Sequence, residues 1–204
     1  MSILPSERIS GQERRSVILQ SAMKLFSERG FRGATTRELA AAAGVSEPVL
    51  YQHFKTKRDL FTAIIEWKIE SSLELVAGLL DSSRTITDDR EFFARLALVI
   101  LEWYERDPAY VRLLLHSGLE GHELSEIFFD KQRCAFHDMV AGYIGERISQ
   151  GVFRPVDPKA AADAFIGMIA HQGLASLLFK AHYDRGQLAG VAVAIFLDGM
   201  RTQS

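Results

Sequence analysis

Residues 35–57 read TTRELAAAAGVSEPVLYQHFKTK, the pattern of two short helices joined by one tight turn. Thr35 begins a Thr-Thr-Arg-Glu capping box, in which the threonine hydroxyl accepts from an amide near Glu38 and the carboxylate reaches back. Gly44 supplies the turn, and Ser46 stands where a cap is needed for a further helix whose first turn tolerates a proline. The spacing therefore predicts a helix-turn-helix.

The second helix of this motif has an apolar and a polar face. The side chains that can bury between the two helices are Leu39, Val45, Leu50 and Phe54. The opposite face of the second helix presents Glu47, Tyr51, Gln52 and His53. Such hydrogen-bonding groups suit base edges and phosphate oxygens in a major groove of DNA. Lys57 follows at a helix N-terminus, where free amides and the helix dipole favour a phosphate.

The remainder of the chain also has helical periodicity, without sustained two-residue alternation, so we expect an all-α protein. Beyond the motif, helices are expected at about residues 13–29, from 57 onward, and at 88–106, 108–117, 122–150, 158–181 and 188–201. In the first of these, Val17, Ile18 and Phe26 are expected on the buried stripe, and Gly30 is expected to allow a left-handed turn at its end.

The charge is divided unevenly along the 204 residues. Residues 1–60 carry 10 Lys and Arg against 6 Asp and Glu, a balance of 10 - 6 = +4, and the rest carries 14 against 20, a balance of 14 - 20 = -6. A basic head on an acidic body suggests that the head meets a polyanion.

Cysteine content and apolar runs indicate the compartment. Cys134 is the lone cysteine and cannot form an internal disulfide, and the charged opening of the chain lacks the apolar stretch of a secretory signal, so we expect a cytoplasmic protein. The longest apolar runs, Leu96–Leu101 and Val191–Leu197, are far shorter than the roughly 18 residues of a membrane span, so no membrane partner is expected.

Residues 14–65 resemble the DNA-binding domain of the tetracycline-repressor (TetR/AcrR) family of bacterial transcription regulators. The matching stretch is GFRGATTRELAAAAGVSEPVLYQHFKTKRDLF, residues 30–61. The resemblance implies a three-helix helix-turn-helix domain over residues 1–56 and a larger helical domain for ligand binding and dimerisation over residues 57–204. It also implies a ligand-responsive regulator without a cofactor: a repressor that binds a palindromic double-stranded operator as a homodimer and is released by a small, largely apolar effector. The effector, the operator sequence and the choice between repression and activation stay open.

Site residues follow from the resemblance position by position. It makes Thr36, Tyr51, His53 and Lys57 phosphate contacts. It makes Arg37, Glu47 and Pro48 readers of the groove, and Ser46 and Gln52 complete the expected DNA-binding set. Glu47 departs from the family pattern, because many relatives have a lysine, a glutamine or a small residue there. A carboxylate near phosphates is repelled unless it accepts from a cytosine amino group, and the alternative is that it caps its own helix.

The resemblance further implies an effector cavity in the helical body, which needs polar groups among apolar walls. The candidates are Phe93, Trp103, Tyr104, His116, Phe136, His137, Phe165, Met168, His171 and Gln172. The alternative for the aromatic residues is plain core, and for the histidines a satisfied core or surface position.

Metal sensing and enzymatic activity are two alternative classes of function. Cys134 and His137 are three residues apart and His116, His122 and His171 could converge on them, which makes metal sensing an alternative. No Cys/His tract has zinc-like spacing, so no metal ligand is assigned. Nucleophile-elbow, phosphate-loop, His-Glu-x-x-His and dinucleotide motifs are lacking, so we expect no enzyme, and an enzymatic or structural helical protein is the weaker alternative.

The helix expected at 158–181 is apolar almost all round, so one subunit would not cover it. Together with the last helix it could form half of a four-helix dimer interface. The expected interface residues are Phe165, Leu177, Val191, Ile195 and Phe196. A completely internal helix pair is the alternative.

Overall fold

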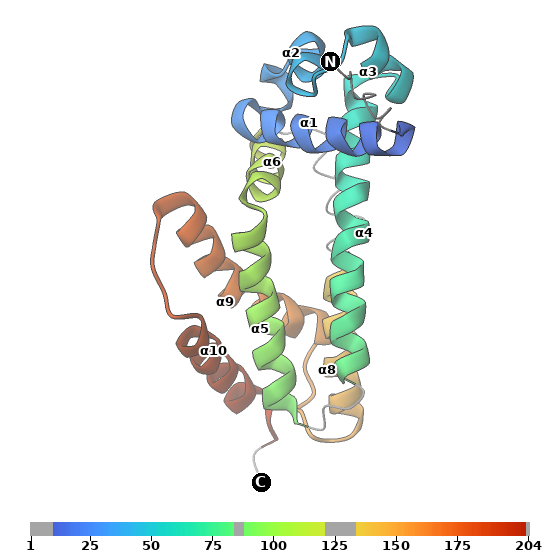
Figure 1. The fold of residues 1–204 in the computed structure, drawn as a ribbon. Coiled ribbons are helices and arrows are strands. Elements are labelled where there is room, and N and C mark those ends of the chain that lie inside the picture. The colour runs from blue at the N-terminus through green and yellow to red at the C-terminus, as the bar shows by residue number, and fades with distance from the viewer. Residues whose placement is uncertain (1–9, 84–87, 121–133, 203–204) are drawn as a thin grey trace, which may run out of the picture. The chain divides into compact units, whose positions relative to one another are not determined.

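The computed structural model describes residues 10–83, 88–120 and 134–202, and over these ranges its regular elements are α-helices with one isolated β-bridge between Phe153 and Arg201. The expected all-α fold is confirmed. The helices, drawn in Figure 1, are α1 (Gly11–Gly33), α2 (Thr36–Ala42), α3 (Glu47–His53), α4 (Lys57–Ser83), α5 (Asp89–Arg106), α6 (Pro108–Leu119), α8 (Cys134–Ser149), α9 (Pro158–Phe179) and α10 (Arg185–Met200). The first part of the helix expected at 122–150 lies outside the described residues.

The predicted helix signals operate as expected in the first part of the chain. Thr35 and Glu38 form both bonds of a capping box, and Ser10 and Glu13 form a second one at the start of α1. Gly44 has a φ of 67°. Helical geometry in α1 is interrupted at Gly30, whose φ of 70° and ψ of 175° belong to a region that favours glycine.

Two local expectations need correction. Val17 is 44% exposed, and the buried stripe of α1 instead runs through Leu19 and Met23 beside Ile18 and Ala22. The helical period leaves two neighbouring stripes to choose from, and the packing partners of α1 decide between them. Ser46 does occupy the N-cap of α3, but its side chain makes no capping hydrogen bond.

The described residues divide into two compact units. The first contains residues 10–68 and 109–120, and the second contains residues 69–83, 88–108 and 134–202. The packing boundary thus falls inside α4, and most of α6 belongs to the unit that holds the helix-turn-helix. The functional division predicted after residue 56 stays a prediction.

An aromatic cluster lies at the centre of the first unit. Phe26 stacks on Phe31, and the Phe61 ring meets both edge-on, with centroids 5.4 and 5.5 Å away. Leu60 from α4 and Tyr110 from α6 are also fully buried. The helix-turn-helix therefore rests on a core supplied by α1, the start of α4 and α6.

The second unit is a bundle in which α9 packs against α5, α8 and α10, and α10 also packs against α5. Its centre is aromatic: Phe93 contacts the rings of Phe165 and Phe196, with centroids 4.9 and 4.8 Å away. At one end the buried Asp89 carboxylate accepts from the Tyr143 hydroxyl at 2.7 Å and from Arg147 at 3.0 Å. This cluster ties α5 to α8, and burial together with Asp89 raises the pKa of Tyr143.

One described helix, α9, is long and apolar enough to cross a membrane by length and composition alone, with a mean hydropathy of 1.3 over its best window. The sequence predicts no membrane span when only uninterrupted apolar runs are counted. The helix α9 reaches its high mean hydropathy although Asp163 and His171 interrupt its apolar residues. Its residues Ala162, Phe165 and Ile169 are fully buried in the second unit, as in a core helix. The same test is passed by core helices, so it is weak evidence for a membrane.

Candidate nucleic-acid interface

The turn between α2 and α3 is held by backbone hydrogen bonds. The amide of Gly44 donates to the carbonyl of Ala41 at 3.1 Å, and the amide of Val45 donates to that of Ala40 at 3.0 Å. Ala40 is almost fully buried, as expected where two helices cross closely. The crossing of α2 and α3 is thereby fixed, and with it the direction in which α3 presents its outer face.

Electrostatics stabilise the start of α2. The Glu38 carboxylate accepts from the Thr35 amide at 3.0 Å and also forms an ion pair with Arg29. These bonds, the Thr35 backbone contribution first, lower the pKa of Glu38. The carboxylate is thus ionised where the helix dipole favours an anion.

The outer face of the helix-turn-helix is open to solvent. Arg37, Ser46, Pro48 and Gln52 are exposed, and Tyr51 is 46% exposed, whereas Leu39, Leu50 and Phe54 are buried. The polar face predicted from the sequence is therefore present as one surface.

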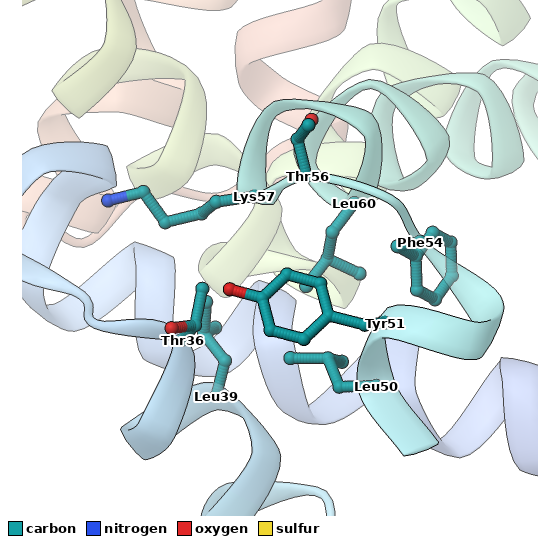
Figure 2. A pocket seen from close by; sticks show the side chains of 8 residues that line it. All are labelled: Thr36, Leu39, Leu50, Tyr51, Phe54, Thr56, Lys57 and Leu60. Carbon is teal, nitrogen blue, oxygen red and sulfur yellow. The ribbon is translucent and has the colours of Figure 1, made fainter. Parts of the chain in front are cut away.

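Three of the predicted phosphate contacts meet at one small hollow. It is lined by Thr36, Leu39, Leu50, Tyr51, Phe54, Thr56, Lys57 and Leu60. Figure 2 shows the Tyr51 hydroxyl and the Lys57 side chain directed toward the side of the hollow where Thr36 lies. Thr56 was not singled out from the sequence, although its position between Lys55 and Lys57 at the start of a helix was a usable signal.

Lys57 has a second role beside any contact with DNA. Its ammonium donates to the carbonyl oxygens of Phe31 and Ala34 at 2.8 and 2.9 Å and lies 4.5 Å from the centre of the Phe31 ring. These carbonyls belong to the last turn of α1 and to its C-cap residue, where a cation is favourable. Two of the three N–H donors are used in this way, which leaves one for a phosphate. Burial lowers the pKa of Lys57, and the Glu120 carboxylate opposes this shift.

Glu47 and Thr36, two residues of the predicted set, contact each other. The Thr36 hydroxyl donates to Oε2 of Glu47 at 3.3 Å. A hydroxyl has a single donor, so Thr36 cannot donate to Glu47 and to a phosphate at the same time. Glu47 is half-buried at the first position of α3, and this contact orients its side chain. His53 is half-buried beside the Phe54 ring.

The candidate effector residues are spread over different environments. Phe93 and Phe165 are fully buried core residues, while Trp103, Tyr104, Phe136, His137 and Gln172 are half-buried. Met168 and His171 lie on the exposed side of α9, and His116 is half-buried in the first unit. The Nδ1 atom of His137 pairs with the Asp163 carboxylate. The structure therefore does not gather the ten residues around one cavity.

Within the described part of the chain, no group of three or more His, Cys, Asp or Glu side chains could hold a metal ion. His122 lies outside that part, and the side chain of Cys134 is not described. The metal-sensing alternative thus has no support.

Two sequence families match the chain. The pattern described as bacterial regulatory proteins of the tetR family matches residues 18–64, and the C-terminal domain of AefR-like transcriptional repressors matches residues 95–199. The chain belongs to the tetR family of bacterial regulatory proteins. The first match covers the helix-turn-helix with the hollow, and the second covers most of the bundle that follows. The exposed polar face of α2 and α3 lies within the first of these two matches.

Individual relatives agree with this assignment. The HTH-type transcriptional activator FasR of Mycolicibacterium smegmatis is 34% identical over 110 residues, 54% of this chain and 49% of FasR. The chain spans about half the length of the curated relatives it matches.

Two solved structures share the fold at a TM-score of 0.70. AibR, in complex with isovaleryl coenzyme A and operator DNA, is 24% identical, and the match covers 90% of this chain and 97% of that one. FadR of Bacillus subtilis, in complex with stearoyl-CoA, is 19% identical, with coverage of 90% and 98%.

Proposed function

We propose that this tetR-family protein is a cytoplasmic repressor that binds a palindromic operator as a homodimer and leaves it when a small, largely apolar effector binds. The observation that carries the proposal is the exposed face of α2 and α3, which presents Arg37, Tyr51 and Gln52 while the opposite faces of both helices are buried. Residues 1–56 are the DNA-binding domain in this proposal, and residues 57–204 bind the effector and the second subunit.

Each half-site is read from the groove and held at the backbone. Thr36, Tyr51, His53 and Lys57 contact phosphates, and Arg37, Glu47 and Pro48 reach base edges, with Ser46 and Gln52 beside them. Phosphate contacts fix the register of the protein on the duplex, and contacts to base edges specify the sequence. Thr36, Tyr51 and Lys57 line one small hollow, and this proximity supports contacts from all three to the same stretch of backbone.

Dimerisation uses the exposed sides of α9 and α10. Val191 and Ile195 of α10 are 53% and 62% exposed, and Leu178 and Phe179 at the end of α9 are 51% and 79% exposed. Apolar side chains in this number on two neighbouring helices support an interface with a second copy. Leu177 is half-buried, whereas Phe165 and Phe196 are buried within one subunit and would back the interface instead of forming its surface.

The effector has an acyl chain in this proposal. AibR is bound to isovaleryl coenzyme A and FadR to stearoyl-CoA in their structures, and the second unit of this chain is rich in aromatic and aliphatic side chains. Apolar walls with a few polar groups suit such a chain. Trp103, Tyr104, Gln172 and His171 are the candidates nearest to solvent for the polar end.

Activation is the second candidate function, because FasR is an activator. In transcription with purified polymerase, a repressor lowers and an activator raises the output of a promoter that carries the bound site.

DNA binding is tested by selection from a pool of randomised duplexes. We expect an inverted repeat whose half-site centres are roughly 34 to 36 Å apart, or a multiple of this, and binding that weakens steeply with salt. Tyr51→Phe should weaken selected and scrambled duplexes alike, and Lys57→Met should weaken both and reduce the salt slope by about 1. Arg37→Ala should relax one base position. If no sequence is enriched by the wild-type protein, the proposed function is wrong.

A further inference from the structure

The corner between α1 and α2, residues 30–34, is held by two side chains that are distant in the sequence. Lys57 donates to the carbonyls of Phe31 and Ala34, as described above. On the amide side, the Arg32 N–H donates to Oε2 of Glu120, which follows the end of α6, at 3.4 Å. All of these residues belong to the first unit.

The absence of a side chain at Gly30 leaves space for the Glu120 carboxylate. A Cβ atom at position 30 would lie 2.0 Å from Oε1 and 3.2 Å from Cδ of Glu120, so the carboxylate occupies the volume that any side chain there would need. The positive φ of Gly30 independently favours glycine. The backbone conformation at position 30 favours glycine, and the missing side chain leaves room there for the Glu120 carboxylate.

Charge joins the two sides of this corner. The Glu120 carboxylate and the Lys57 ammonium attract each other, and burial of Lys57 makes that attraction stronger than it would be in water. The Lys57 ammonium lies over the Phe31 ring, which packs against Phe26 and Phe61. The corner thus has bonds to its amide and carbonyl groups and a half-buried ring, which together restrict its backbone.

We infer that Glu120 is a positioning residue for the DNA-binding surface, acting through the corner from which Thr35, Thr36 and Arg37 directly continue. It does not touch DNA; it sets where α2 begins and hence where Thr36 and Arg37 meet the duplex. The inference rests on the proposed DNA-binding function. A change at the end of α6 would reach the helix-turn-helix through this contact.

The test compares Glu120→Ala with Glu120→Gln. Alanine removes the acceptor for the Arg32 amide, whereas the glutamine amide oxygen can still accept. Glu28→Ala is the charge-matched control, because Glu28 is an exposed glutamate of α1 in the same unit. The probes are the duplex that the wild-type protein selects from a randomised pool and a scrambled duplex of the same length. Hydrogen exchange of the Arg32 amide and the melting temperature are measured on each variant without DNA.

Glu120→Ala should bind the selected duplex roughly tenfold more weakly, since hydrogen bonds to charged groups are among the stronger ones, and should bind the scrambled duplex within about twofold of wild type. Its Arg32 amide should exchange faster. Glu120→Gln should keep most of the affinity, and Glu28→Ala should lose none. Gly30→Ala, which displaces the carboxylate, should weaken selected-site binding too, and adding Glu120→Ala to it should cost less than the sum of the two changes.

Unchanged binding of the selected duplex by Glu120→Ala would overturn the inference, as would an unchanged exchange rate of the Arg32 amide. A parallel loss on both duplexes together with a lower melting temperature would also overturn it, because that result describes general destabilisation. These results differ from failure of the proposed function, in which wild-type protein enriches no sequence at all.

Discussion

At the scale of single residues, the carboxylate of Glu47 is the feature that departs from the family pattern. It stands at the first position of α3, and Thr36 donates to one of its two oxygens. A carboxylate has a second acceptor oxygen, and in a major groove the donor that matches it is the N4 amino group of cytosine. Glu47 is therefore expected to favour a cytosine in each half-site.

Glu47→Gln tests this role. A glutamine both donates and accepts and pairs with adenine, so the selected base at one position of each half-site should change from cytosine to adenine, with a discrimination of about 1 to 3 kcal/mol. Sequencing of duplexes bound from a randomised pool measures the change. Glu28→Gln serves as the control and should leave the selected sequence unaltered. If Glu47→Gln selects the wild-type sequence, Glu47 only organises α3.

At the scale of elements, the capping box makes the stability of α2 depend on pH. The lowered pKa of Glu38 means that the folded protein binds this proton less readily than the unfolded chain does. The stabilisation is fully present above the ordinary value of 4.5, and it is lost as the pH falls through the folded-state pKa. Thr35→Ala removes the threonine hydroxyl from the capping box and should lower the free energy of unfolding by about 1 kcal/mol.

Glu38→Gln is the variant that isolates this effect. Urea unfolding between pH 7 and pH 3 should show a smaller loss of stability on acidification than in wild type, because the variant has no carboxylate to protonate at the cap. Glu28→Gln removes an exposed carboxylate of α1 and should follow the wild-type curve. Parallel curves for wild type and Glu38→Gln would contradict the assignment.

At the scale of the whole molecule, the proposed function requires two DNA-binding domains at a fixed spacing, so it couples dimerisation to DNA binding. Ile195→Glu places a charge on the exposed apolar side of α10 and should yield a monomer that has lost affinity for the selected duplex. Light scattering on the eluted protein measures the oligomeric state. Leu98→Glu is the matched control, because Leu98 is 41% exposed and belongs to α5, which is outside the two helices of the proposed interface. If Ile195→Glu is still a dimer, the proposed location of the interface on α10 is wrong.

Effector release is tested with stearoyl-CoA as the probe and coenzyme A alone as the control. The acyl-CoA should weaken binding of the selected duplex roughly 5- to 150-fold, and the duplex should weaken binding of the acyl-CoA by the same factor, since linkage is reciprocal. Titrations at fixed salt in both directions measure the two factors. His171→Ala should reduce this response while leaving effector-free DNA binding close to wild type. Binding of the duplex that is unchanged by stearoyl-CoA would refute the proposed switch for this ligand.

The helix-turn-helix could be predicted from the amino-acid sequence alone, because the signals that specify this motif are local. Capping boxes, a turn glycine and the period of a helix act within a few residues, so Thr35, Glu38 and Gly44 could be read without a partner segment. The all-α class and the helix bounds followed for the same reason, to within several residues where they are described.

Contacts between residues that are distant in the sequence could not be predicted and became visible in the three-dimensional structure. The contact of Glu120 with the Arg32 amide spans 88 residues, the bond from Lys57 to the Phe31 carbonyl spans 26, and no sequence period records either. The buried side of α1 and the placement of most of α6 in the first unit likewise depend on packing partners. An amphipathic pattern predicts that one face of a helix is buried, but it does not identify the element that packs against that face.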